Sequence, residues 1–202
     1  MISTIAFDLG RVIFDFDYWV ALDALKDRVE VSLGKLHNDI FFSSLCLDFE
    51  KGIEEPEEFF DKFKSHSRLN MEFKDFVPVW NSIFSLKPET VEFIKQLKPR
   101  YKIALISNIN KLHYLSLLEA YPQVFSLFDT QVLSWQEKSI KPEEKIYKAL
   151  LEKTQVSKDK LVYIDDRQDL INEALKMGFK CLRFTGIEDC RRKLQDMGVV
   201  WH

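Results

Sequence analysis

Three short apolar runs constrain the fold of this chain more than any other feature. They are TIAFDL (4–9), KIALIS (102–107) and LVYID (161–165), and their apolar residues are nearly continuous rather than alternating. Continuous apolar runs of this length are typical of strands that are buried on both faces, as in a parallel sheet. Two further runs, FDTQVL (128–133) and KCLRF (180–184), complete a set of five predicted strands.

Helical patterns separate these strands. Segments 88–98 and 141–153 each carry a proline near their start, which favours the first turn of a helix, and apolar residues on one face. Segment 169–179 contains Gly178 near its end, and glycine is common directly after a helix. Strands that alternate with helices in this way predict an α/β fold with a doubly wound parallel sheet.

Residues 14–86 interrupt the alternation. A crossover between parallel strands needs only one helix, but this segment contains four helical patterns. They cover residues 18–30, 34–47, 56–65 and 73–84. We therefore predict a core formed by residues 1–13 and 87–202, with an inserted helical cap at 14–86. Ligands of open α/β sheets bind beyond the carboxyl ends of the strands, so a cap at this point would roof the site.

Composition excludes several classes of function. The chain has 202 residues and a net charge of −3, without a basic block, which argues against nucleic-acid binding. No apolar run approaches the roughly 18 residues that span a membrane, and the first strand pattern leaves no room for a signal peptide. The three cysteines lack metal-type spacing. We expect a reduced, cytoplasmic protein, either a monomer or a homodimer, that binds neither nucleic acid nor membrane.

Polar residues stand where the predicted strands end. Asp8 ends the first strand, Ser107 and Asn108 end the second, and Asp165 and Asp166 end the fourth, while Lys141 opens the predicted helix after the third. The carboxyl ends of parallel strands share one edge of the sheet, so these side chains should converge there. Carboxylates can hold a divalent cation, and a hydroxyl, backbone N–H groups and a lysine can neutralise phosphate oxygens. Because a carboxylate can also attack phosphorus, the set indicates phosphate chemistry.

These residues lie in segments that resemble the four motifs of the haloacid dehalogenase (HAD) superfamily, a large group dominated by phosphatases. The matching segments, in order, are IAFDLGRV, IALISN, KPEEKIY and VYIDDRQDLINEALKMG. FEKGIEEPEEF (49–59) resembles the acidic, glycine-containing segment of the family's helical cap. Residues 86–113 most resemble a bacterial branch of sugar-phosphate phosphatases (α-D-glucose-1-phosphate phosphatase-like). The resemblance spans nearly the whole chain and implies a Rossmann-like core with a helical cap.

The resemblance also implies a magnesium site. Asp8 takes the place of the family's nucleophile, which is a Mg²⁺ ligand as well, and the backbone carbonyl of Gly10 takes the place of a second ligand. Asp166 aligns with the third ligand and Asp165 stands beside it. Which of these two carboxylates binds the ion directly stays open at this stage.

The phosphate-binding residues are implied in the same way. Ser107 and the backbone of Asn108 would hold the phosphate, and Lys141 would pair with both Asp8 and the phosphate. Asp8 and Lys141 are thus the predicted catalytic residues, and Asp8 would carry an aspartyl phosphate.

The chain departs from the family pattern at three places. Most family phosphatases have a second aspartate two residues after the nucleophile, which protonates the leaving group and later activates water; here that position is Gly10. The similar bacterial branch also has DLG, so the glycine is compatible with activity. Leu170 stands where the family often has Asp or Asn, and Asp169 is one residue away. The segment before Lys141 also lacks a glycine that relatives usually have.

Residues near the motifs carry weaker expectations. Asp15 and Asp17 are expected at the cap hinge or on the surface, His113 on a helix face, and Arg11 either in the site or in a salt bridge to the cap. If a residue other than Gly10 supplies a proton to the leaving group, Arg11, Asp15, Asp17 and the cap residues are the places to look for it.

The leading hypothesis is a Mg²⁺-dependent phosphatase of a small phosphorylated metabolite, with sugar phosphates among the candidates. One alternative is a metal-free haloacid dehalogenase, but such enzymes lack the paired Asp165 and Asp166. The other is a member of the superfamily that binds a ligand or partner without turnover, for which Gly10 and Leu170 are the evidence.

Overall fold

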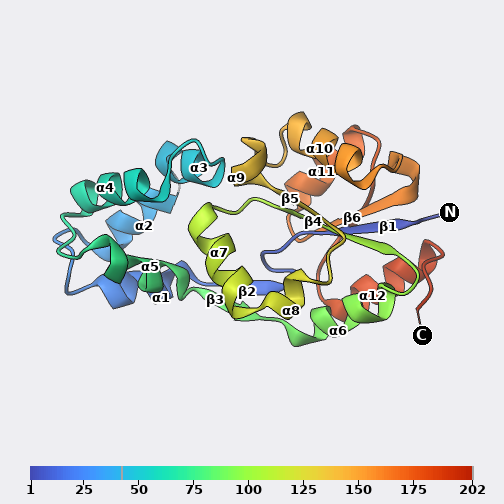
Figure 1. Cartoon of the computed structure of the whole chain (residues 1–202), viewed down its shortest axis with the longest axis horizontal. Coiled ribbons are helices and arrows are strands. Elements are labelled where there is room, and N and C mark those ends of the chain that lie inside the picture. The colour runs from blue at the N-terminus through green and yellow to red at the C-terminus, as the bar shows by residue number, and fades with distance from the viewer. Residues whose placement is uncertain (42, 202) are drawn as a thin grey trace.

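A parallel sheet forms the centre of the computed structural model, which describes residues 1–41 and 43–201 (Figure 1). Its five strands lie in the order β5-β4-β1-β6-β7, and all neighbours are parallel. The strands are β1 (Thr4–Phe7), β4 (Lys102–Ser107), β5 (Thr130–Leu133), β6 (Leu161–Asp165) and β7 (Lys180–Arg183). The predicted α/β fold with a doubly wound sheet is confirmed.

Helices cover both faces of the sheet, which explains the continuous apolar runs. One face is covered by α10 (Glu144–Thr154) and α11 (Gln168–Lys176), and the other by α6 (Pro88–Leu97) and α12 (Ile187–Asp196) (Figure 1). Side chains alternate between the two faces along a strand. Ala6 therefore packs on the face covered by α10 and α11, and Phe7 packs on the face covered by α6 and α12. The other helices that follow β4 in the chain are α7 (Lys111–Ala120), α8 (Pro122–Phe125), α9 (Ser134–Glu137) and the 3₁₀ helix Lys158–Lys160.

Five of the described helices between β1 and β4 in sequence lie to the left of the sheet in Figure 1. They are α1 (Tyr18–Leu25), α2 (Leu33–Phe41), α3 (Ser44–Glu50), α4 (Pro56–Ser67) and α5 (Phe73–Asn81). Aromatic side chains form much of their shared core, for example Phe49 stacked on Phe59 with ring centroids 4.1 Å apart. The division into a core (1–13 and 87–202) and a cap (14–86) is a proposal, and "cap" below means residues 14–86.

A two-stranded antiparallel ribbon joins these helices to the sheet. It consists of β2 (Phe14–Phe16) and β3 (Phe84–Leu86), paired so that Phe16 lies opposite Phe84. The sequence patterns did not predict it. The predicted helix 73–84 was therefore wrong at its end, because Phe84 belongs to β3 of this ribbon.

Two other helix predictions need correction. The predicted helix 34–47 is two helices, because Ser43 has an extended backbone and begins a new helix, α3. The predicted helix 141–153 begins only at Glu144: Lys141 and Pro142 lie in the preceding loop and are joined by a cis peptide bond. No helix in the described part of the chain is long and apolar enough to cross a membrane.

Candidate active site

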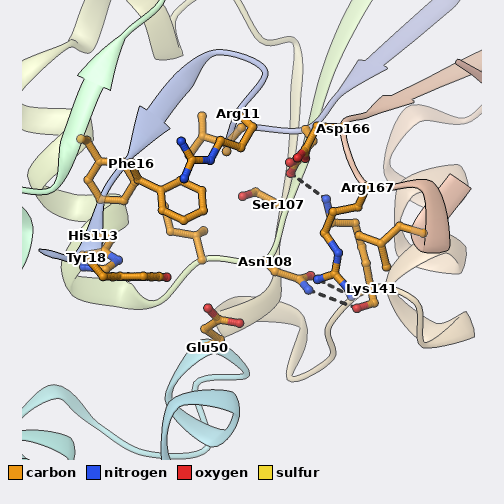
Figure 2. A pocket seen from close by; sticks show the side chains of 16 residues that line it. Arg11, Phe16, Tyr18, Glu50, Ser107, Asn108, His113, Lys141, Asp166 and Arg167 are labelled. Atoms are coloured by element: carbon orange, nitrogen blue, oxygen red, sulfur yellow. Dashed lines mark hydrogen bonds and ion pairs between the residues drawn. The ribbon is translucent and has the colours of Figure 1, made fainter. Parts of the chain in front are cut away.

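The polar residues at the strand ends surround one cavity at the carboxyl edge of the sheet (Figure 2). The cavity has a volume of about 360 Å³ and is open on one side. Six of the seven residues predicted for the site line it: Asp8, Gly10, Ser107, Asn108, Lys141 and Asp166. The seventh, Asp165, is fully buried and contacts Lys141.

Lys141 joins two of the carboxylates. Its side chain is 2% exposed, and its Nζ donates to Asp8 Oδ1 at 2.6 Å and to Asp165 Oδ2 at 2.7 Å. Burial alone would lower the pKa of Lys141, but the two carboxylates raise it, so the ammonium keeps its charge. Burial raises the pKa of Asp8 to about 7, and Lys141 opposes this rise. The cation therefore favours the ionised form of Asp8, the form that a nucleophile needs.

The two adjacent aspartates differ in their surroundings. Asp165 accepts hydrogen bonds from Lys141 and the Tyr163 hydroxyl through Oδ2, and from the backbone N–H of Arg167 through Oδ1 at 2.9 Å. Asp166 instead lines the cavity and is partly exposed. Oxygens of Asp8, Asp165 and Asp166 lie within 4.8 Å of one another. A set of carboxylate oxygens beside a cavity fits a hard cation such as Mg²⁺, with Asp166 better placed than Asp165 to bind it.

Asn108 fixes the loop that carries Lys141. The side-chain Oδ1 of Asn108 accepts from the Lys141 N–H at 2.7 Å, and its Nδ2 donates to the Lys141 carbonyl at 3.1 Å. The Asn108 side chain is thus used within the protein. The hydroxyl of Ser107 lies at the cavity (Figure 2), where it can donate to a bound oxyanion.

An aromatic ring occupies the space beside Gly10. A Cβ atom added at Gly10 would lie 3.0 Å from Cε1 of the Phe16 ring. The guanidinium of Arg11 lies over this ring, 4.4 Å from its centroid, and is 3.6 Å from the carboxylate of Asp15. Arg11 therefore both lines the cavity and forms a salt bridge to residue 15, so the two expectations for it are compatible.

His113 lies on a helix, α7, as expected, and its side chain is buried and links two parts of the chain. It is 4% exposed, its Nε2 donates to the Trp80 carbonyl at 3.2 Å, and its Nδ1 accepts from the Asn110 amide at 2.9 Å. We assign this tautomer because a carbonyl can only accept. Burial lowers the pKa of His113 to about 3, so the ring is neutral. His113 also lines the cavity.

The other candidates near the motifs are occupied elsewhere. Asp17 accepts from the Trp19 N–H at 2.9 Å and caps α1, and Asp15 also pairs with Lys87 at 3.1 Å. Leu170 lines the cavity, whereas Asp169 pairs with Arg167 at the surface.

Comparison with known proteins identifies the family of this chain. A family model described as haloacid dehalogenase-like hydrolase matches residues 2–176. The chain belongs to this family. It is 24% identical over 207 residues to D-ribitol-5-phosphate phosphatase of Bacteroides thetaiotaomicron, an alignment that covers 96% of this chain and 97% of the relative.

Solved structures of HAD enzymes share the fold. A HAD family enzyme from B. thetaiotaomicron, in complex with magnesium and inorganic phosphate, superposes with a TM-score of 0.81 at 24% identity, covering 91% of this chain and 94% of that one. A HAD-like family hydrolase from Porphyromonas gingivalis gives 0.83 at 23%, covering 96% and 98%. L-2-haloacid dehalogenase from Xanthobacter autotrophicus gives 0.66 at 15%, covering 99% and 85%.

Sequence reasoning missed the residues that the cap contributes to this HAD site. The cavity is also lined by Phe16, Tyr18, Glu50 and Phe84, all from residues 14–86, and by Arg167. A signal for Glu50 was present, because it lies in the acidic segment 49–59 that resembles the family's cap. Nothing in the local sequence marks the three aromatic residues, since their approach to the cavity depends on the β2–β3 ribbon and on α1.

Proposed function

We propose that this HAD-like hydrolase is a Mg²⁺-dependent phosphatase of a small phosphorylated metabolite, and that it acts through an aspartyl phosphate on Asp8. The observation that carries the proposal is the buried Lys141 between Asp8 and Asp165, with Asp166 at the same cavity. Lys141 offsets the charge of only one of the three carboxylates Asp8, Asp165 and Asp166, and the negative charge that is left suits a divalent cation and, with it, an anionic substrate.

The metal would be held by Asp8, Asp166 and the backbone carbonyl of Gly10. When bound, Mg²⁺ supplies positive charge that offsets the repulsion between the Asp8 carboxylate and the phosphate oxygens. The solved HAD enzyme from B. thetaiotaomicron, which binds magnesium and phosphate, supports this assignment by analogy.

The protein's own groups would position the phosphate. An oxygen of Asp8 attacks phosphorus, the hydroxyl of Ser107 and the Asn108 backbone N–H donate to phosphate oxygens, and Lys141 neutralises charge. Asp165 holds Lys141 in place by accepting a hydrogen bond from its ammonium group. The Asn108 side chain does so by accepting one from the Lys141 backbone N–H. In this assignment Asp165 supports the lysine rather than the metal.

The substrate would be a phosphorylated sugar or polyol. A cavity of about 360 Å³ is within the range of small-molecule sites, and the relative from B. thetaiotaomicron is named for a phosphorylated polyol. The aromatic side chains from the cap can cover the carbon skeleton, while Arg11 and Glu50 offer polar contacts to hydroxyl groups. The cysteines Cys46, Cys181 and Cys190 are all free, which supports a cytoplasmic location.

A phosphate-release assay tests the proposal. The purified protein is incubated with p-nitrophenyl phosphate and with a panel of sugar and polyol phosphates, with Mg²⁺ or with EDTA. We expect Mg²⁺-dependent release from several esters and none from 2-haloacids. Release of halide from 2-haloacids without metal would identify a dehalogenase instead. A protein that binds phosphate esters but releases no phosphate from any of them would support the non-catalytic alternative.

A further inference from the structure

The site needs a proton donor that Gly10 cannot provide. When an alkyl phosphate is cleaved, the leaving oxygen must receive a proton to depart as an alcohol. Such general acid catalysis is typically worth ~10²–10⁴-fold in rate. The space beside Gly10 is filled by the ring of Phe16, so the donor must come from elsewhere in the cavity.

Most ionisable groups at the cavity are unsuited to this role. The guanidinium groups of Arg11 and Arg167 do not release protons in proteins. Burial raises the pKa of Tyr18 far above neutral. Both ring nitrogens of His113 are engaged, by Asn110 and by the Trp80 carbonyl.

The remaining cavity groups already have roles. Lys141 is held between two carboxylates, Asp8 is the proposed nucleophile, and Asp166 is the proposed metal ligand. Asp15 and Asp17, considered earlier as donors, are not among the described residues that line the cavity. Glu50 is the ionisable side chain that is left.

Glu50 faces the cavity from the cap. It is the last residue of α3, and Figure 2 shows its carboxyl group directed into the hollow from the side opposite Asp166. The Ser134 hydroxyl donates to the Glu50 carbonyl at 2.6 Å, which fixes this end of α3 against α9. Because Glu50 lines the cavity, its side chain is within reach of a ligand bound there.

The environment of Glu50 keeps a proton available near neutral pH. Burial raises its pKa to about 7; Arg167 and Lys141 oppose this rise, and Asp8 adds to it. Tyr18 and Cys46 lie near enough for Glu50 to influence their own pKa values, and both remain neutral. A general acid is most effective when its pKa lies close to the working pH.

We propose that Glu50 is the proton donor to the leaving oxygen, a role that rests on the proposed phosphatase function. As the bond from Asp8 to phosphorus forms, the bond from phosphorus to the leaving oxygen breaks, and the proton of the Glu50 carboxyl group moves to that oxygen. The leaving group departs as an alcohol. Glu50, now ionised, takes a proton from the water that attacks the aspartyl phosphate. Release of phosphate restores Asp8 and protonated Glu50, with one water consumed.

The positions of the two carboxyl groups fit an in-line displacement. The attacking and leaving oxygens lie on opposite sides of phosphorus in such a reaction. Asp8 belongs to the edge of the sheet, whereas Glu50 approaches from the cap, across the cavity from Asp166 and Ser107 (Figure 2). The leaving group therefore departs toward the cap, where Glu50 is located.

The test compares Glu50→Gln with the wild type on esters of graded leaving-group pKa. The parameter is kcat/KM, because it reports only steps up to the departure of the leaving group. We expect a loss of ~10²–10⁴-fold on alkyl phosphates and less than about tenfold on p-nitrophenyl phosphate, whose leaving group is stable as an anion. Asp48→Asn is the matched control, since Asp48 lies on the same helix and is not among the described cavity residues.

Two further measurements separate proton donation from a structural role. With an alkyl phosphate, wild-type kcat/KM should fall above about pH 7 as Glu50 loses its proton, and this basic limb should vanish in Glu50→Gln. Independently of activity, ¹³C NMR of glutamate-labelled protein should show a carboxyl group that titrates near pH 7 and is missing in Glu50→Gln.

Each outcome is decisive. An equal loss on alkyl and aryl esters would make Glu50 a binding or positioning residue and overturn the proposal, as would unchanged kinetics in Glu50→Gln. If the wild type cleaves no phosphate ester in the presence of Mg²⁺, the proposed function itself fails, and the role of Glu50 fails with it. Thermal melting of both variants confirms that each is folded.

Discussion

Protonation of His113 should destabilise the protein in mild acid. In the folded protein burial lowers the pKa of His113 to about 3, whereas an exposed histidine has a pKa near 6.5. The unfolded chain therefore binds one more proton between these values, and stability is lost as the pH falls below about 6.5. From about pH 7.5 to about pH 5, the free energy of unfolding should drop by about 2 kcal/mol on account of this one ring.

The assay is urea unfolding at several pH values for the wild type and His113→Gln. Asp8 and Glu50 have raised pKa values and therefore contribute with the opposite sign, but equally in both proteins. The difference between the two proteins isolates the histidine: the variant should be less stable at about pH 7.5, and the gap should shrink by about 2 kcal/mol at about pH 5. A gap that does not depend on pH would show that the ring is not held neutral by burial.

Three further substitutions test the site. Asp8→Asn should lower phosphatase turnover by orders of magnitude while the melting temperature stays close to that of the wild type, and activity within about tenfold of the wild type would exclude the covalent mechanism. Lys141→Met leaves Asp8 and Asp165 buried without their cation, so urea unfolding should show a loss of ~3–5 kcal/mol along with loss of turnover. Gly10→Asp places its Cβ 3.0 Å from Phe16, so the free energy of unfolding should fall by ~1–3 kcal/mol, and the added Phe16→Ala should recover part of it.

The sheet could be predicted because burial on both faces leaves a direct mark on the sequence. KIALIS (102–107) coincides with β4, and its residues face helices on both sides. The β2–β3 ribbon left no such mark. Each of its strands has three residues, and the pairing of Phe16 with Phe84 joins positions far apart in the chain. Local periodicity cannot show a contact of this kind.

The site could be predicted as a set of residues but not as a network. The strand ends placed Asp8, Ser107, Lys141 and Asp166 at one edge, and they line one cavity. The hydrogen bonds from Asn108 to the Lys141 backbone depend on a loop 33 residues away that the sequence indicated as helix. Side-chain amides that hold a backbone in place have no spacing rule, so such a role emerges only from the fold.

If Glu50 donates the proton, the contact between the cap and the sheet brings the proton donor to the nucleophile. The nucleophile and Lys141 come from the core, whereas Glu50 comes from the cap, so the full set of groups exists only when the cap is docked. Ser134 holds the end of α3 at the Glu50 carbonyl, and His113 holds α5 at the Trp80 carbonyl. Docking of the cap would therefore fix the proton donor and close the aromatic wall over the substrate in one step, whereas a free aspartate at position 10 would have placed the donor on the core itself.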